Sequence, residues 1–375
     1  MYEISLLWTV LIGIVALVIG ALVGGSIARR RLAASSSPQS LARPTLDSEI
    51  RPEESVNYKS RAAVVINPLK SEGHGLRATV EAVCRQEGWA APLWLETTAD
   101  DPGSGQTQQA IDQGVDVVIA AGGDGTVRTV AEQLAGTDIP LGILPLGTGN
   151  LLARNLDFTL TRNEWAIRVA LWGRDRRIDV ARAQMAPDLD ESHVFLVIAG
   201  LGFDAAVMAG TSSDLKKKVG WWAYLDAGMR NLSGKRARVE LQIDDEPPFR
   251  RRVRTVLGGN CGKLPGGIEL MPDAKIDDGL LDVMSVAPRG IVGWFGVAAR
   301  VLGRQRRGLP IVEHFQGRSV HIQSEETLEV QLDGDPIGST HNLTMFIDEG
   351  ALLVRVPTPE QQRQMRPQMW PALNS

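Results

Sequence analysis

The sequence predicts an α/β domain over residues 61–174 and a β-rich, sandwich-like domain over residues 175–356, preceded by one transmembrane helix. Three observations support this prediction. Short apolar runs alternate with helical periodicity in the first range, and β-type segments separated by Gly, Asp and Pro turns fill the second. The first 31 residues contain a long stretch without charge. The length of 375 residues also fits more than one domain.

The expected elements of the first domain alternate between strand and helix. Strands are expected at 62–68, 92–98, 115–120 and 139–147, and helices at 76–88, 105–114, 126–135, 150–156 and 163–173. This alternation is typical of parallel βαβ units, which form a parallel sheet with helices on both faces. Ligands bind such sheets at the carboxyl ends of the strands, so the loops that follow these strands are the candidate site.

The second domain is expected to consist of short strands with two helical interruptions, at 211–232 and 289–305. The first of these carries Lys216–Lys218 beside tryptophans, and the second joins an apolar stripe to several arginines. Such faces suit a membrane interface, although the same stripes would also serve as core-facing helix surfaces. Residues 357–375 are rich in Pro, Gln and Met and are expected to be disordered.

The N-terminus has no charged residue from Ile4 to Ile27, and Arg29–Arg31 follow at once. As a helix this stretch would measure about 36 Å, enough to cross a hydrocarbon core of roughly 30 Å. The order of charge is the reverse of a secretory signal and favours a cytoplasmic body. We therefore expect an anchor at 1–31, a flexible linker at 32–60 and a single-pass location in the cell membrane. A cleaved signal or a buried helix is the alternative.

The composition restricts the classes of function. A net charge of −4 argues against a dedicated nucleic-acid binder, although clustered arginines and lysines can attract phosphates or anionic lipid locally. The two cysteines, Cys84 and Cys261, lie far apart without metal-ligand spacing, so neither a disulfide framework nor a cysteine metal centre is expected. A homodimer is compatible with the sequence, which does not decide the oligomeric state.

The loop after the strand at 115–120 reads GGDGT and carries the clearest functional signal. Glycines let the backbone approach an anion without obstruction by a Cβ atom, and Thr126 can cap a helix whose N-terminus favours negative charge. Asp124 would repel a phosphate unless Mg²⁺ lies between them, or unless its side chain holds the loop or an acceptor hydroxyl. The alternative is a tight turn with a capping residue.

A second glycine loop, GTGN at 147–150, follows the next strand. Because neighbouring parallel strands end at the same edge, the two loops are expected to form one nucleotide cleft, with NPLKSEG at 67–73 as a third wall. The sequence contains no GxxxxGK followed by Ser or Thr, so the cleft is not a P-loop site.

The pair GGDGT and LPLGTGN resembles motifs of the diacylglycerol kinase catalytic-domain family, which includes bacterial lipid kinases and, more distantly, sphingosine kinases. The family fold is shared with NAD kinases. Three further stretches resemble its motifs in the right order, namely GLGFDAAV at 200–207, GGIELMPDAKIDDGLLDV at 266–283 and VQLDGDP at 330–336. The resemblance covers residues 61–355 and implies an α/β nucleotide-binding domain followed by a lipid-substrate domain.

The resemblance also implies which residues contact the nucleotide. They are Asn67, Pro68, Thr98 (with Thr97 as the alternative), Gly122, Gly123, Asp124, Gly125, Thr126 and Thr148. The sequence departs from the family pattern after Pro68, where the family has N-P-x-S-G. It also has Leu151 where the family often has Asp, which leaves the identity of the substrate open.

The catalytic residues implied by the resemblance are Asp335 and Asp124. Asp335 stands at the glutamate of the family's D-G-E motif, the general base, and its shorter arm requires a closer loop or an intervening water. Asp333 would support it. A structural Mg²⁺ would be held by the Lys275 and Leu280 carbonyls and the Asp278 carboxylate. Without the family, the turn around Asp278 would be an ordinary one.

The resemblance implies an ATP-dependent lipid kinase that uses Mg²⁺ and transfers the γ-phosphoryl group to a lipid hydroxyl. The first expectation for the acceptor is diacylglycerol, giving phosphatidic acid, and the partner is then a membrane lipid. Three alternatives stay open. They are a sphingosine-like or other lipid kinase, an NAD kinase, and a catalytically inactive membrane sensor of lipid or nucleotide.

Overall fold

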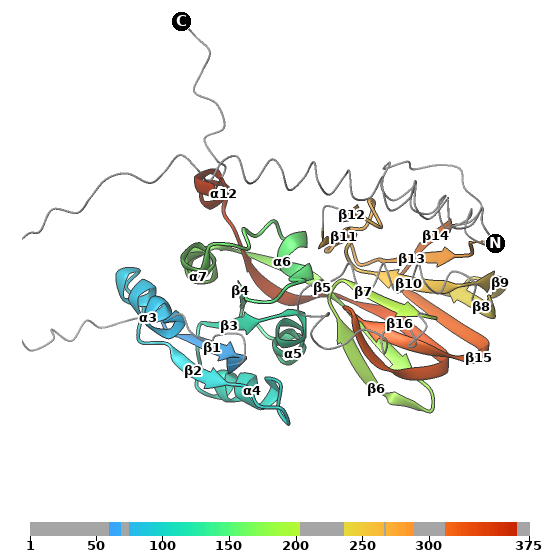
Figure 1. The fold of residues 1–375 in the computed structure, drawn as a ribbon, viewed down its shortest axis with the longest axis horizontal. Helices are drawn as coiled ribbons and strands as arrows, with labels where there is room; N and C mark the ends of the chain where they lie inside the picture. Colours follow the sequence, from blue (N-terminus) through green and yellow to red (C-terminus); the bar gives the residue numbers. More distant parts are fainter. Residues whose placement is uncertain (1–59, 69–74, 203–235, 266–267, 289–311, 366–375) are drawn as a thin grey trace, which may run out of the picture. The chain divides into compact units, whose positions relative to one another are not determined.

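The computed structural model describes residues 60–68, 75–202, 236–265, 268–288 and 312–365 (Figure 1). Several predicted segments lie outside the described residues. These are the anchor at 1–31, the linker at 32–60 up to residue 59, most of the motif at 200–207, the helices expected at 211–232 and 289–305, and the end of the tail from 366.

The predicted location in the membrane is corrected by the structure. Among the residues described, no helix combines the length and the apolar character needed to cross a bilayer. This finding overturns the predicted single-pass membrane location. Residues 1–31, on which that prediction rested, are themselves outside the described part of the chain.

The first half of the described chain is an α/β unit. Its elements are β1 (Ala62–Ile66), α3 (Leu76–Gln86), β2 (Leu93–Glu96), α4 (Ser104–Asp112), β3 (Val117–Gly122), α5 (Asp124–Leu134), β4 (Leu141–Pro145), α6 (Leu151–Asn155) and α7 (Asn163–Trp172). The strands are parallel and lie in the order β4-β3-β1-β2. Every residue of β1, β3 and β4 is buried, as expected for strands covered on both faces.

The strand order also explains why helices cover both faces of this sheet. The chain moves from β1 outward to β2 and then back past β1 to β3. Because such crossovers are right-handed, this reversal puts α3 and α4 on opposite faces. Accordingly α3 contacts α7, while α4 contacts α5 (Figure 1). The buried residues of α3 follow the helical period, with Leu76, Val80, Val83 and Cys84 facing the sheet.

The second half of the described chain is rich in antiparallel strands. They are β5 (Arg174–Met185), β6 (Asp188–Phe195), β7 (Ile198–Leu201), β8 (Ala237–Ile243), β9 (Phe249–Val253), β10 (Thr255–Gly259), β11 (Lys263–Leu264), β12 (Ile268–Glu269), β13 (Leu281–Val286), β14 (Val312–Gly317), β15 (Ser319–Leu332) and β16 (Asp335–Val356). Alternating burial along β8 and β15 produces an apolar face that packs in a second hydrophobic core. The prediction of a β-rich second half is confirmed.

The long strand β16 joins the two halves into one sheet. It pairs antiparallel with β15 and β5, and near its end Val354 pairs in parallel with Leu141 of β4. The hydrogen-bonded path therefore runs without a break from the antiparallel strands to the parallel ones (Figure 1). The start of β16 is thus held by the same sheet that carries the glycine loops.

The beginning of the tail is a further correction. The composition of residues 357–375 predicts a disordered tail, whereas Pro359–Met365 form the helix α12. This helix is anchored to the α/β unit because Trp165 Nε1 on α7 donates a hydrogen bond of 3.0 Å to the Gln361 carbonyl oxygen. The bond supplies a tertiary contact that composition alone does not reveal.

Candidate active site

The carboxyl ends of β1, β3 and β4 bring the predicted loops together. Gly122 pairs with Pro145 at the ends of their strands, and Leu146 N donates to the Gly122 carbonyl oxygen at 2.9 Å. On the other side of β3, Asn67 N donates to the Ala121 carbonyl oxygen at 3.2 Å. The strand order reverses between β1 and β3, which is where open α/β sheets bind their ligands.

The glycines of the two loops allow close packing. A Cβ atom at Gly122 would lie 2.5 Å from Thr126 Oγ1, and one at Gly147 would lie 2.6 Å from the Gly123 Cα atom. The GGDGT and GTGN loops therefore touch backbone to backbone, and at position 147 this approach requires a residue without a Cβ atom. The predicted convergence of the two loops into one site is present in the structure.

Gly147→Ala should lower the free energy of unfolding by about 1–3 kcal/mol, because the added methyl group pushes the loops apart. Gly123→Ala is the matched variant. Its methyl group would meet Gly147 Cα at 3.5 Å, an ordinary contact, so the loss should be smaller. Urea unfolding measures both. Equal losses in the two variants would show that the loops separate easily, contrary to this packing.

Asp124 fastens one loop to the other. Its Oδ2 accepts a hydrogen bond from Asn150 N at 2.9 Å and its Oδ1 accepts one from Leu151 N at 2.5 Å, at the start of α6. Burial, helped by the nearby carboxylates of Asp333 and Asp335, raises the pKa of Asp124 to about 6, against the opposing effect of these amides. Of the roles considered for this aspartate, holding the loop is the one its contacts support.

The other residues predicted to contact nucleotide differ in their exposure to solvent. Thr148 is exposed in the second loop, and Thr126 is buried in the first turn of α5. After β2, Thr97 is buried whereas Thr98 is exposed and accepts a hydrogen bond of 3.0 Å from Asp101 N. Thr98 is therefore the threonine of this pair that solvent reaches. Pro68 directly follows Asn67 at the end of β1.

The motif DGD forms the tight turn between β15 and β16. Leu332 pairs with Asp335 across the turn, and the two residues between them, Asp333 and Gly334, have φ angles of 50° and 94°. Two positive φ angles are typical of a type I′ turn, which Asp-Gly favours. The turn therefore fixes the directions in which the two aspartates leave the backbone.

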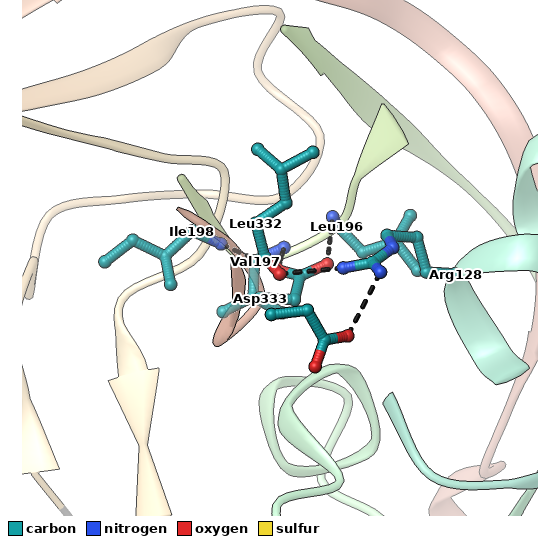
Figure 2. A network of polar contacts seen from close by, with 7 residues as sticks. Arg128, Leu196, Val197, Ile198, Leu332 and Asp333 are labelled. Carbon is teal, nitrogen blue, oxygen red and sulfur yellow. Dashed lines mark hydrogen bonds and ion pairs between the residues drawn. The ribbon is translucent and has the colours of Figure 1, made fainter. Parts of the chain in front are cut away.

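Asp333 points inward and binds three backbone amides (Figure 2). Its carboxylate accepts hydrogen bonds of 2.9, 2.9 and 3.0 Å from the amides of Leu196, Val197 and Ile198. Burial raises the pKa of Asp333, while these amides and the Arg128 guanidinium act in the opposite direction. Asp333 thus ties the turn to the chain entering β7, which accords with its predicted supporting role.

Asp335 lies beside the first glycine loop. Its Oδ2 accepts a hydrogen bond of 3.0 Å from Arg128 Nη2 on α5, and the same oxygen would lie 3.6 Å from a Cβ atom at Gly125. Asp335, from the β-rich half, therefore lies next to the GGDGT loop of the α/β half. The structure brings together Asp124, Asp335 and the glycine loops, as the sequence predicts.

The predicted magnesium loop is held elsewhere, against β5 and β16. Asp179 on β5 accepts hydrogen bonds from Gly279 N at 2.7 Å and from Gly350 N at 2.8 Å. Within the loop, Asp278 Oδ1 accepts a bond of 3.2 Å from Leu280 N. Hydrogen bonds from this loop to the glycine loops are not among those found in the described residues.

The residues predicted for magnesium have suitable chemistry. Carbonyl and carboxylate oxygens, as at Lys275, Asp278 and Leu280, are ligands that Mg²⁺ accepts alongside several waters. In the described ranges, no three His, Cys, Asp or Glu side chains gather in a way that could hold a metal. The predicted ligand set of two carbonyl oxygens and one carboxylate stays a prediction.

Sequence reasoning missed two residues of the site. Arg128 contacts the turn of the β-rich half, and Asp179 organises the loop at 275–280. The available signals were a charged residue within the apolar period of a helix and an aspartate between two apolar residues of a strand. Neither indicates its partner, because each contact joins segments distant in sequence.

Comparisons with known proteins agree with this geometry. Residues 61–183 match the model of the diacylglycerol kinase catalytic domain, and residues 197–355 match that of the YegS C-terminal NAD kinase beta sandwich-like domain. A Pseudomonas fluorescens protein named "Probable lipid kinase YegS-like" is 37% identical over 311 residues, which cover 79% of this chain and 95% of that protein. A protein of the same name from Pseudomonas aeruginosa is 32% identical, covering 80% and 95%.

The fold is also found among solved structures. A diacylglycerol kinase from Bacillus anthracis aligns with a TM-score of 0.64 and 24% identity, covering 81% of this chain and 98% of that one. This likeness concerns the fold. The family model and the named relatives together define a kinase phosphotransferase. The chain belongs to the family of YegS-like lipid kinases.

Proposed function

We propose that this chain transfers the γ-phosphoryl group of ATP to the free hydroxyl of diacylglycerol, giving phosphatidic acid and ADP. The observation that supports this most directly is the position of Asp335. A carboxylate from the lipid-substrate half stands next to Gly125, at the loop where the sequence predicts the phosphates. A general base has to lie within reach of the hydroxyl that attacks the phosphorus atom.

The residues of the two halves would then share the reaction. The glycine loops and the N-terminus of α5 would bind the phosphates through backbone amides, with Thr126 and Thr148 in the same loops. Asp335 would accept the proton of the lipid hydroxyl as that oxygen bonds to the γ-phosphorus and the bond to the ADP oxygen breaks. Mg²⁺, when bound, supplies neutralisation of phosphate charge. A structural Mg²⁺ would be held by the loop that contains Asp278.

An acceptor screen tests the proposal. The protein is incubated with γ-labelled ATP and Mg²⁺ and with detergent micelles of diacylglycerol or sphingosine, or with NAD in solution. We expect label in phosphatidic acid. Label in sphingosine phosphate would favour the alternative lipid kinase, and label in NADP alone would contradict a lipid kinase. If nothing is labelled while ATP still binds, the inactive sensor is the better interpretation.

A further inference from the structure

Arg128 on α5 contacts the turn between β15 and β16 and so connects the two halves at the site (Figure 2). It lies on α5, one helical turn after Asp124, and its side chain is only 18% exposed. Its Nη1 donates a hydrogen bond of 2.7 Å to the Leu332 carbonyl oxygen, and its Nη2 donates one of 3.0 Å to Asp335 Oδ2. The guanidinium therefore binds both residues that flank the two-residue turn.

The geometry of this contact is suited to orienting the Asp335 carboxylate. A guanidinium group is planar and presents its donors in a fixed fork, so two bonds to one turn fix both its position and its direction. The side chain of Asp335 is 54% exposed. An exposed carboxylate without such a partner would sample several rotamers, and only some of these would point toward the glycine loop.

The stability gained from this ion pair is small. Pairs with one solvent-exposed partner typically contribute about 0–1 kcal/mol. The site, in contrast, gathers the carboxylates of Asp124, Asp333 and Asp335, and the last two raise the pKa of Asp124. Arg128 is the cation whose charge also favours ionisation of Asp333. A role in arranging the carboxylates explains the contact better than a role in holding the fold.

We propose that Arg128 is a positioning residue, which holds the turn between β15 and β16 against α5 and aims the Asp335 carboxylate at the phosphate loop. This inference rests on the proposed function for its catalytic consequence, since it assigns the orientation of the base to a residue of the nucleotide-binding half. Its structural consequence, the fixed position of the turn, holds for whatever acceptor the protein uses.

Kinetics of Arg128→Gln test the catalytic consequence. We expect kcat to fall about 10- to 100-fold, because a small misplacement of a catalytic group has effects of this size, while KM for ATP changes much less. Arg128→Lys keeps the charge but loses the fork and should recover part of kcat. The double variant with Asp335→Asn should be no slower than Asp335→Asn alone, because Arg128 acts through that carboxylate. If the double variant instead loses kcat by the product of the two single losses, the proposal is overturned.

Hydrogen exchange tests the structural consequence without any activity measurement. Asp333 N donates to the Ile198 carbonyl oxygen at 2.8 Å, so its amide exchange reports on the turn. We expect this amide to exchange faster in Arg128→Gln than in the unmodified protein. Arg168→Gln is the matched control. It removes an arginine of α7 whose Nε lies 2.9 Å from Glu87 Oε1, in an ion pair that does not involve the turn.

The two readouts separate the possible failures. Unchanged exchange at Asp333 in Arg128→Gln would overturn the positioning role, whatever the acceptor. Faster exchange in a protein that labels no lipid would support the positioning of the turn and contradict the proposed function instead. Faster exchange together with a reduced kcat and an unaffected Arg168→Gln variant is the result expected if both proposals hold.

Discussion

Asp335→Asn should reduce the kcat of phosphoryl transfer by about 10²- to 10⁴-fold, the range by which a positioned general base accelerates a reaction. Asparagine has nearly the same shape but cannot take up the proton of the attacking hydroxyl. KM for ATP should change little, since the glycine loops remain intact. Because Asp335 is exposed and its ion pair with Arg128 contributes little to stability, unfolding in urea should be almost unchanged.

Two further variants make this result specific. Asp348→Asn removes another exposed carboxylate of β16 that pairs with an arginine, Arg182 at 3.4 Å, and should retain full activity. Asp335→Glu restores the residue found in the family's D-G-E motif and should remain active, because the longer arm is the form that the resemblance associates with the base. Activity in Asp335→Asn equal to that of Asp348→Asn would remove Asp335 from the mechanism.

Local patterns predicted the parallel half of the fold well. The apolar runs that became β1, β3 and β4 are buried throughout, so sequence and burial agree without help from distant contacts. The glycine loops could be placed for the same reason, since a parallel sheet brings successive strand ends to one edge. The sequence indicates that these glycines let the backbone approach a phosphate, and the structure shows that they also let the two loops approach each other.

The parts that the sequence could not predict depend on pairing over long distances. β16 runs from Asp335 to Val356, but its register with β5 shifts between Asp348 and Leu352. Because this irregularity interrupts the alternating pattern, the sequence indicates shorter strands instead of one long strand. Arg128 and Asp335 are 207 residues apart, and nothing in the local pattern of either indicates the other. The position of Asp335 beside the glycine loop could be inferred only through the resemblance, and its contact with Arg128 could not be inferred at all.

Asp333→Gly should lower the free energy of unfolding by roughly 3–5 kcal/mol, because three buried amides lose their acceptor and each unsatisfied group costs about 1–3 kcal/mol before relaxation. Glycine is chosen because Asp333 has a φ of 50°, which alanine would adopt only with strain. The loss should appear as a lower urea midpoint with an unchanged slope. Since the turn also carries Asp335, phosphoryl transfer should fall in the same variant even well below the unfolding midpoint.

Asp244→Gly provides the matched control for this last prediction. Asp244 also has a left-handed backbone, with a φ of 47°, and accepts a backbone hydrogen bond of 2.8 Å from Ser319 N, but it is exposed to solvent. Both variants gain the same backbone freedom in the unfolded chain, so their difference isolates the buried amides. We expect a loss of about 1 kcal/mol or less for Asp244→Gly. Similar losses in both variants would mean that the amides of 196–198 find water once Asp333 is gone, and that the carboxylate is not what ties this turn to β7.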